Sequence, residues 1–168
     1  MPNVEYKGMN LQVPEIDSEW REHFKLARQH HKLFLRACGS CNLMRYPPTH
    51  ACPWCQALEW TWKDVSGKGH IYSYEVVMQA IQPGFKDATP YVVVLVELDE
   101  QKAQPNPDES LRVIANLVKP DLTMEAEQNV AIGKRVRVVF QDLADHMALP
   151  QFTLSDEPPQ GRVWRLPE

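Results

Sequence analysis

Apolar and polar positions alternate directly after the second cysteine pair, and further strand-like segments follow. Leu58, Trp60 and Trp62 alternate with Glu59, Thr61 and Lys63, and this period of two predicts a half-buried strand. Further strand-like segments are expected at residues 69–79, 91–98, 111–118 and 134–141, with a weaker one at 149–154. Turn-rich stretches separate these segments, at residues 82–89, 101–110 and 119–133.

The pattern is different in the first part of the chain. Asp17 or Ser18 can cap a helix that runs to about residue 31 and carries its apolar side chains on one face. Residues 1–14 are mostly polar, so we expect an extended arm there. A short strand at residues 33–35 then leads into the first of two cysteine pairs.

The five later strands suit a small Greek-key barrel. They occupy about 90 residues, and their longest connection lies between the third and fourth strands. An OB-fold has this shape, including a helix or loop at that connection. A short helix at residues 125–129 is expected to occupy it.

Four cysteines form the strongest chemical motif. Cys38 and Cys41 are separated by two residues, as are Cys52 and Cys55, and ten residues lie between the pairs. Each spacing lets one turn aim two sulfurs at a common point, and two such turns supply the four tetrahedral ligands of a closed structural zinc site. Iron in a rubredoxin-like site is the main alternative, and two accidental pairs of reduced cysteines are the weaker one. With four protein ligands, no position is left for a catalytic water.

These patterns together predict a mainly β protein. It consists of an N-terminal helix and a rubredoxin-like zinc ribbon followed by a five-stranded OB-fold barrel. The expected divisions are residues 1–32 for the arm and helix, 33–65 for the ribbon, 66–154 for the OB-fold and 155–168 for a C-terminal tail.

Composition and charge narrow the function. The 168 residues are 43% hydrophobic, which is enough for a core, and the formal net charge of −4 argues against a surface that binds nucleic-acid phosphates. Residues 1–8 lack a basic region followed by an apolar stretch, and the apolar run at 91–96 is too short to span a bilayer. We therefore expect a cytoplasmic protein without a membrane partner, and clustered cysteines suit a reducing compartment.

Three residues are candidates for binding a ligand. Arg135 and Arg137 belong to a basic cluster with Lys134 and alternate with valines. They are expected on the outer face of a strand, where they are either solvated or in contact with a phosphate. Phe85 lies in the loop that would join the first two barrel strands. It is either packed inward or exposed as an anchor, because OB-folds often use this loop for ligands.

No catalytic constellation is visible in the sequence. His23, His70 and His146 have no partner at a spacing that suggests a proton relay. A Gly-rich phosphate loop and a nucleophile elbow are both lacking, and the cysteines are all assigned to the metal. We therefore expect no catalytic residue, and the chain is not expected to be an enzyme on its own.

The order of helix, cysteine pairs, tryptophan strand and barrel resembles a known family. This is the zinc-ribbon/OB-fold family associated with acyl-CoA enzymes, named domain-of-unknown-function family 35, and the resemblance covers about residues 20–154. The matching positions are Cys38 and Cys41, Tyr46-Pro47-Pro48, Cys52-Pro53-Trp54-Cys55, Glu59-Trp60, Ser66-Gly67-Lys68-Gly69, Ile71-Tyr72-Ser73, Pro90-Tyr91 and Ile132-Gly133. The chain departs from it at Asn42, where many members have glycine.

The resemblance implies a noncatalytic accessory subunit of a thiolase-type acyl-CoA enzyme. Known partners in the family include thiolases, hydroxymethylglutaryl-CoA synthase and aldolases of side-chain degradation, and an aromatic-acid or benzylsuccinate-pathway thiolase is one specific case. The subunit would support complex assembly or the joint binding of a CoA thioester.

Two other functions remain open at this point. A single-stranded nucleic-acid-binding module is the main alternative, because zinc ribbons and OB-folds both serve that role and Tyr72, Tyr74 and Tyr91 offer stacking faces. An independent hydrolase or transferase acting on acyl-CoA is the weaker one.

Overall fold

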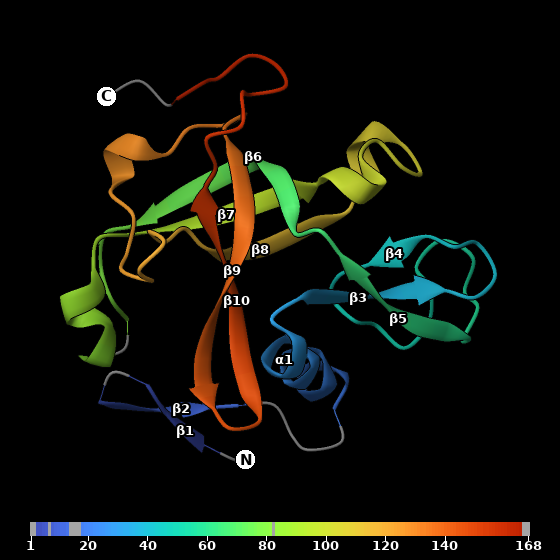
Figure 1. Cartoon of the computed structure of the whole chain (residues 1–168), viewed down its shortest axis with the longest axis horizontal. Helices are drawn as coiled ribbons and strands as arrows, with labels where there is room; N and C mark the ends of the chain where they lie inside the picture. The colour runs from blue at the N-terminus through green and yellow to red at the C-terminus, as the bar shows by residue number, and fades with distance from the viewer. Residues whose placement is uncertain (1–2, 7, 14–17, 82, 166–168) are drawn as a thin grey trace.

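The computed structural model describes residues 3–6, 8–13, 18–81 and 83–165. Within these ranges the chain is mainly β, as predicted, with one α-helix (Figure 1). The strands are β1 (Asn3–Tyr6), β2 (Met9–Gln12), β3 (Leu33–Cys38), β4 (Met44–Arg45), β5 (Trp60–Val65), β6 (Lys68–Val77), β7 (Tyr91–Leu98), β8 (Arg112–Asn116), β9 (Arg135–Ala144) and β10 (Met147–Leu154), and the helix is α1 (Glu19–His30). Short 3-10 helices lie at Pro83–Ala88, Asp99–Gln101, Pro107–Glu109 and Glu127–Asn129.

The five later strands form an OB-fold, which confirms the predicted fold class. They pair antiparallel in the order β10-β9-β6-β7-β8, and a parallel bridge between Leu117 and Phe152 joins the two outer strands into a barrel. The inward positions of β7 are valines that alternate along the strand and are at most 1% exposed. Along β7 the alternation is therefore one of burial and not of residue type, because the outward positions Tyr91, Val93 and Leu95 are also apolar but only half-buried.

The turn between β5 and β6 depends on a glycine. Gly67 has a φ of 68°, in the left-handed region, and a Cβ at this position would overlap the side chain of Val138. Only glycine satisfies both conditions. The close approach lets the start of β6 lie directly on β9, where Lys68 pairs with Arg137.

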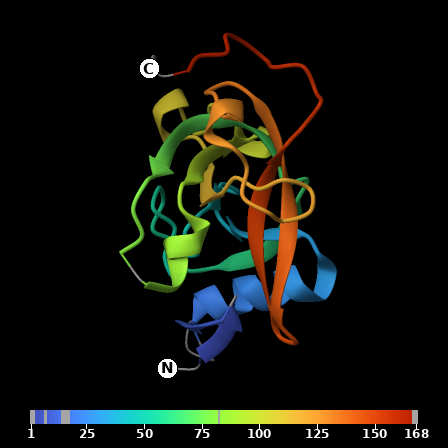
Figure 2. The same cartoon turned by 90° about the vertical axis from the view of Figure 1, so that its left-hand side faces the viewer.

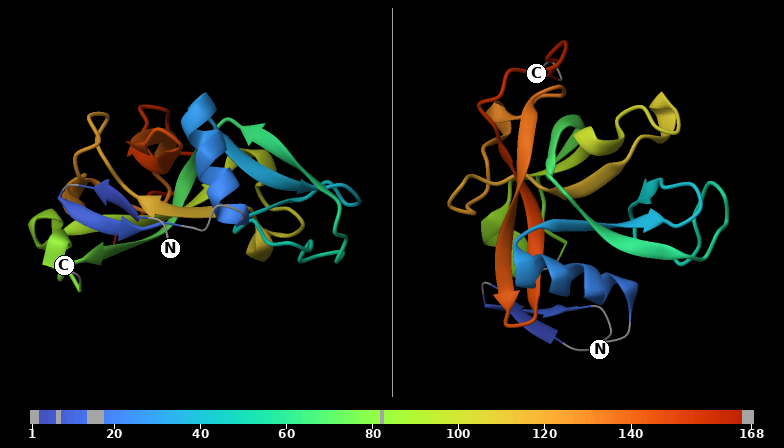
Figure 3. Two further views of the ribbon diagram at one scale, coloured as in Figure 1. Left: turned by 90° about the horizontal axis from the view of Figure 1, so that it is seen from below. Right: turned by 45° about the vertical axis from the view of Figure 1, so that its right-hand side comes forward.

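A second, three-stranded sheet, in the order β4-β3-β5, carries the cysteine turns. In Figure 3 this sheet projects from the barrel, and its cysteine turns lie at the far end. Its base shares the barrel's hydrophobic core through Leu33, Leu35 and Met44. The division of the chain at residue 65 stays a prediction.

Helix α1 lies between the ribbon sheet and the barrel. Ser18 caps it, because its Oγ accepts a hydrogen bond from the N–H of Arg21 at 3.2 Å. The alternative cap, Asp17, lies outside the described residues. The helix ends at His30, and His31 follows in the left-handed conformation with a φ of 45°.

The expected extended arm is instead a hairpin. Strands β1 and β2 pair antiparallel, and Figure 2 shows them below the barrel beside α1. Val4 and Val13 are buried there against Met147, in the turn region of the long β9–β10 hairpin. These apolar side chains explain the difference, since they give an otherwise polar segment a surface to pack against.

The connection between β8 and β9 also differs from expectation. A single 3-10 turn, Glu127–Asn129, stands where a short helix at residues 125–129 was predicted. Among the described residues, no helix is long and apolar enough to span a membrane.

Candidate metal centre

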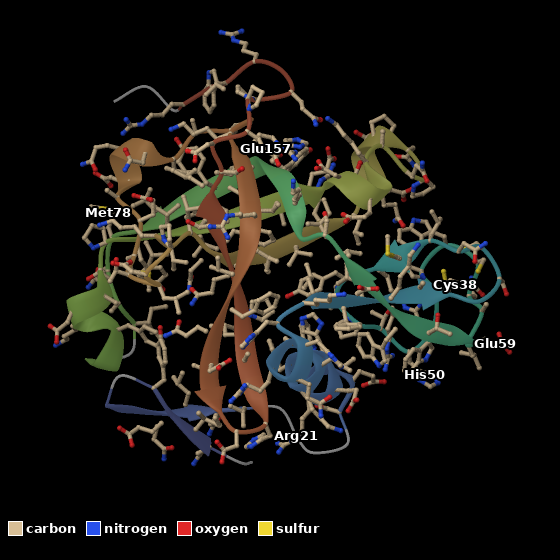
Figure 4. All side chains as sticks on the ribbon, viewed as in Figure 1. Arg21, Cys38, His50, Glu59, Met78 and Glu157 are labelled. Atoms are coloured by element: carbon tan, nitrogen blue, oxygen red, sulfur yellow. The ribbon has the colours of Figure 1, made fainter. Side chains whose placement is uncertain are left out.

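The four cysteine sulfurs converge at the outer end of the ribbon sheet. Figure 4 shows this end, marked by Cys38, on the opposite side of the molecule from Met78. The sulfurs of Cys38 and Cys55 are 3.5 Å apart and those of Cys41 and Cys52 are 3.6 Å apart. All four lie within 4.8 Å of one another.

This geometry fits a tetrahedral ion. With Zn–S bonds of about 2.3 Å, neighbouring sulfurs of a tetrahedral site lie about 3.8 Å apart. The cluster is therefore close to the size that a structural zinc ion requires, and a four-sulfur site also accommodates iron. The residues that would hold the ion are Cys38, Cys41, Cys52 and Cys55, as the spacing predicts.

The two cysteine turns repeat one backbone pattern. The N–H of Asn42 donates to the Cys38 carbonyl at 3.1 Å, and the N–H of Gln56 donates to the Cys52 carbonyl at 2.9 Å. Asn42 and Gln56 both adopt the left-handed conformation, with φ values of 61° and 63°. This conformation favours glycine, and asparagine is among the non-glycine residues that enter it most readily.

Backbone amides prepare two of the sulfurs for deprotonation. Hydrogen bonds from the N–H groups of Cys41 and then Ser40 lower the pKa of the Cys38 thiol to about 6. Burial opposes deprotonation of Cys52, but hydrogen bonds from the amides of Cys55 and Trp54 leave its pKa below the ordinary value. Because a metal binds the thiolate form, these amides favour coordination.

Two buried arginines fix the loop that connects the cysteine turns. Arg36 and Arg45 face each other across β3 and β4 and are 3% and 2% exposed. Both donate to the carbonyl oxygen of Thr49, at 3.1 and 2.9 Å. The Arg36 guanidinium also stacks 3.7 Å from the centre of the Trp60 ring. A cation over an indole keeps the arginine charge in a favourable environment when water is excluded.

Sequence reasoning missed these arginines. Arg36 occupies the register position opposite Trp62, and Trp60 is the partner of Cys38, two residues further along β3. The two tryptophans were expected only to mark a half-buried strand. Because they are two positions apart, their rings lie on the same face of β5, where the guanidinium of Arg36 can stack on them. An arginine two residues before the first cysteine was the available signal.

A histidine joins the helix to the ribbon. His23 is 2% exposed, and its Nδ1 donates to the carbonyl oxygen of Phe34 at 2.9 Å. Its ring centre lies 5.9 Å from that of Tyr46, which follows β4. Burial lowers the pKa of His23 to about 4, although the bond to Phe34 acts in the opposite direction. His23 is therefore neutral at pH 7.

The expectation that Arg135 is solvated is wrong. Its neighbour Val136 on β9 packs in the core, so Arg135 lies on the outer face of the strand but is covered there. It is 3% exposed, and its two terminal nitrogens donate to the two carboxylate oxygens of Asp99 at 2.7 and 2.5 Å. Glu157, labelled at the top of the barrel in Figure 4, accepts a further bond from Arg135 at 3.1 Å. The guanidinium is buried because two carboxylates satisfy it. The guanidinium of Arg135 therefore already has its ion-pair partners.

Arg137 and Phe85 have different surroundings. Arg137 is exposed and lines a shallow hollow of about 480 Å³ together with Lys68 and Phe140. Phe85 is half-buried in the 3-10 turn between β6 and β7 and does not line this hollow. A ligand-binding role for either residue stays a prediction.

Of the three tyrosines considered for base stacking, Tyr72 is the most exposed, at 43%. The guanidinium of Arg112 lies 3.7 Å from the centre of its ring and covers one face. Tyr74 and Tyr91 are half-buried.

Comparison with known proteins identifies the family. Residues 62–141 match the family described as "ChsH2, C-terminal OB-fold domain". A "DUF35 domain-containing scaffold protein" of Methanothermobacter thermautotrophicus is 32% identical over 120 residues, which cover 70% of this chain and 77% of that protein. A "Probable enoyl-CoA hydratase alpha subunit" of Thermomonospora curvata is 31% identical over 139 residues, 83% of this chain. The alignment covers only 38% of that longer relative.

A solved structure agrees with these relatives. A chain of the "Ltp2-ChsH2(DUF35) aldolase" superposes with a TM-score of 0.66 at 30% sequence identity. The match covers 84% of this chain and 98% of that chain. The fold, the cysteine geometry and the relatives agree, and the protein described here belongs to the DUF35 family of OB-fold proteins.

Proposed function

We propose that this protein is a noncatalytic, zinc-containing subunit of a thiolase-type acyl-CoA enzyme. The observation that carries the proposal is the match to the aldolase complex, whose DUF35 chain is covered almost completely, at 98%. The relative named as a hydratase alpha subunit supports a role beside an acyl-CoA enzyme. The relative named as a scaffold protein supports a role in assembly.

The metal centre supports a structural role within such a complex. When bound, a zinc ion with four thiolate ligands supplies cross-linking of the ribbon, because a closed site has no open position for a substrate. The chain's own residues then hold the two cysteine turns in register, through the amide bonds and the buried arginines. This arrangement suits a rigid projection beside the barrel.

A contribution to binding the CoA thioester is the finer part of the proposal. Arg137 is exposed, and among the described residues it forms no ion pair. It therefore remains a candidate to contact a phosphate group of CoA once the partner is in place. Arg135 does not share this role, because Asp99 and Glu157 already pair with it.

Co-purification tests the proposal directly. The tagged protein, expressed in the organism that encodes it, is isolated at low salt and its partners are identified by mass spectrometry. We expect a thiolase-like chain in stoichiometric amount. A hydratase or aldolase chain would retain the role beside an acyl-CoA enzyme but replace the partner class, and the absence of any acyl-CoA enzyme would contradict the proposal.

Calorimetric titration with CoA tests the finer part. The purified complex is compared with the isolated chain and with a complex carrying Arg137→Gln, and exposed Arg162→Gln serves as the matched control. We expect the complex to bind CoA more tightly than the chain alone, with a loss of affinity in Arg137→Gln only. Equal affinity in all four samples would contradict a contribution from this residue.

A further inference from the structure

The backbone of β8 is paired on one side only along most of its length. The N–H of Leu98 donates to the Leu111 carbonyl at 3.0 Å, and the N–H of Leu117 donates to the Val92 carbonyl at 2.8 Å. Odd-numbered positions of β8 therefore face β7, because hydrogen-bonded positions alternate along an antiparallel strand. Ile114, an even-numbered position between them, directs its N–H and C=O away from β7.

The opposite side of β8 meets β10 at a single point. Val118, another even-numbered position, donates to the Phe152 carbonyl at 2.8 Å. Among the described residues, the isolated bridge at Leu117 and Phe152 is the one pairing that joins the two strands. Two residues before Phe152 stands Pro150, which has no N–H with which to continue the pairing towards Ile114. The barrel seam therefore opens beside Ile114.

The opening is a hollow of about 220 Å³. It is bordered by four consecutive residues of β8, at 113–116. Successive side chains of a strand point to opposite faces, so four in a row border one hollow only along the edge of the strand. The backbone edge of β8 is thus a wall of this hollow.

The other walls are largely apolar. They include Phe24 of α1, Tyr46, and Leu149 and Pro150 of β10. Ile114 itself is 55% exposed. The lining contains neither lysine nor arginine, which disfavours a phosphate ligand. A free strand edge inside an apolar groove is the arrangement that binds an extended peptide by strand addition.

We propose that an extended segment of the partner enzyme adds as a strand to β8 at Ile114 and places an apolar side chain in this hollow. The inference rests on the proposed function, which supplies an acyl-CoA enzyme as the partner. A second copy of this chain fits less well, since its own β8 edge is recessed between the same walls. A single extended segment reaches such an edge without moving them.

Hydrogen exchange of the isolated chain and of the purified complex tests the inference. The amide of Ile114 is expected to exchange fast in the chain alone and at least about tenfold more slowly in the complex, because strand pairing protects it. The amide of Val113 faces β7 and serves as the internal control, slow in both samples. An intact complex with an unprotected Ile114 amide would overturn the docking mode and leave the proposed function standing.

Two variants at one position separate the backbone from the side chain. Ile114→Pro removes the outward N–H without removing a bond to β7, and proline is tolerated on an edge strand with this orientation. Ile114→Thr removes apolar surface and keeps the N–H. We expect at least about a tenfold loss of partner affinity in Ile114→Pro and less than about threefold in Ile114→Thr.

The remaining outcomes are also decisive. Equal losses in the two variants would indicate a side-chain contact and overturn strand addition. Protection of Ile114 in a homodimer without the enzyme would assign the edge to a second copy and overturn the proposal as well. If Ile114→Pro does not fold, as judged by circular dichroism, hydrogen exchange at the Ile114 amide of the wild-type complex decides whether strand addition occurs. A complex that lacks any acyl-CoA enzyme would overturn both the docking and the proposed function.

Discussion

The barrel and the ribbon hold their structures by different means. The barrel centre consists of aliphatic and aromatic side chains such as Ile71, Val94 and Phe152, all fully buried. The ribbon buries two cysteines, Cys38 and Cys52, and two arginines instead. Its few residues enclose too little apolar area for an independent core, and small modules of this kind depend on metals or disulfides. The barrel should therefore tolerate loss of the ion better than the ribbon's outer end.

The largest effect is expected from the metal ligands. Cys52→Ser removes a sulfur that is 1% exposed, and structural zinc supplies on the order of 10–16 kcal/mol of apparent binding free energy in small modules. We expect loss of the ion and of the amide signals of the ribbon's outer end, while β7 signals persist. Metal analysis and two-dimensional NMR measure both. Exposed Leu58→Ser is the control, and stoichiometric metal in Cys52→Ser would contradict a four-thiolate site.

The next effect concerns the barrel alone. Phe152 is fully buried, and Phe152→Ala is expected to lower the free energy of unfolding by about 3–5 kcal/mol through lost transfer energy and a cavity. Urea denaturation measures the change, and the metal content should stay constant. Ile81→Ala, at a fully exposed position, should change stability by less than about 0.5 kcal/mol. Loss of metal in Phe152→Ala would show that the two regions unfold together.

Acidification probes the helix that joins the two regions. The pKa of His23 is about 4 in the folded chain and about 6.5 when unfolded, so unfolding takes up a proton between these values. Stability from this group is therefore present above pH 6.5 and declines towards pH 4, by ~3 kcal/mol at most. His23→Gln should flatten the stability profile in this window, whereas exposed His146→Gln should not. Identical slopes would show that His23 titrates normally.

The smallest effect is expected at the buried ion pair of the barrel. Hydrogen bonding to Arg135 holds the pKa of Asp99 below its ordinary value. This stabilisation is complete above about pH 4, the ordinary pKa of aspartate, and is lost as the pH falls through the lower folded value. Asp99→Asn should cost ~1–3 kcal/mol at pH 7 and reduce the acid sensitivity. Chemical denaturation at pH 3 and 7 measures both, with exposed Asp108→Asn as the control. An acid sensitivity in Asp99→Asn equal to the wild type would contradict this role.

The sequence predicts those parts of the structure that are determined by residues close together in the chain. Strand-like apolar segments locate the barrel strands, and the spacing of Cys38, Cys41, Cys52 and Cys55 locates the cluster of four sulfurs, because both depend on neighbouring residues. The burial of Arg135 was missed because its partners Asp99 and Glu157 lie 36 and 22 positions away in the chain. A hydrophobic pattern predicts that charged side chains lie in solvent. Only the three-dimensional fold brings these two carboxylates to Arg135.

The N-terminal hairpin was missed for a related reason. Val4 and Val13 stand in a polar segment, and the surface they cover is built by Met147 near the other end of the chain. The open barrel seam was also not predictable. It depends on where Pro150 falls opposite β8, which is a matter of register and not of composition.

Tyr46 belongs to two sites at once. It lies between the cysteine turns in sequence and lines the hollow beside Ile114. We expect an occupant of that hollow to be linked to the ion, because Tyr46 directly follows β4 of the sheet that carries the cysteine turns, and such linkage is reciprocal. The proposed complex should therefore hold a metal ion more tightly than the isolated chain does.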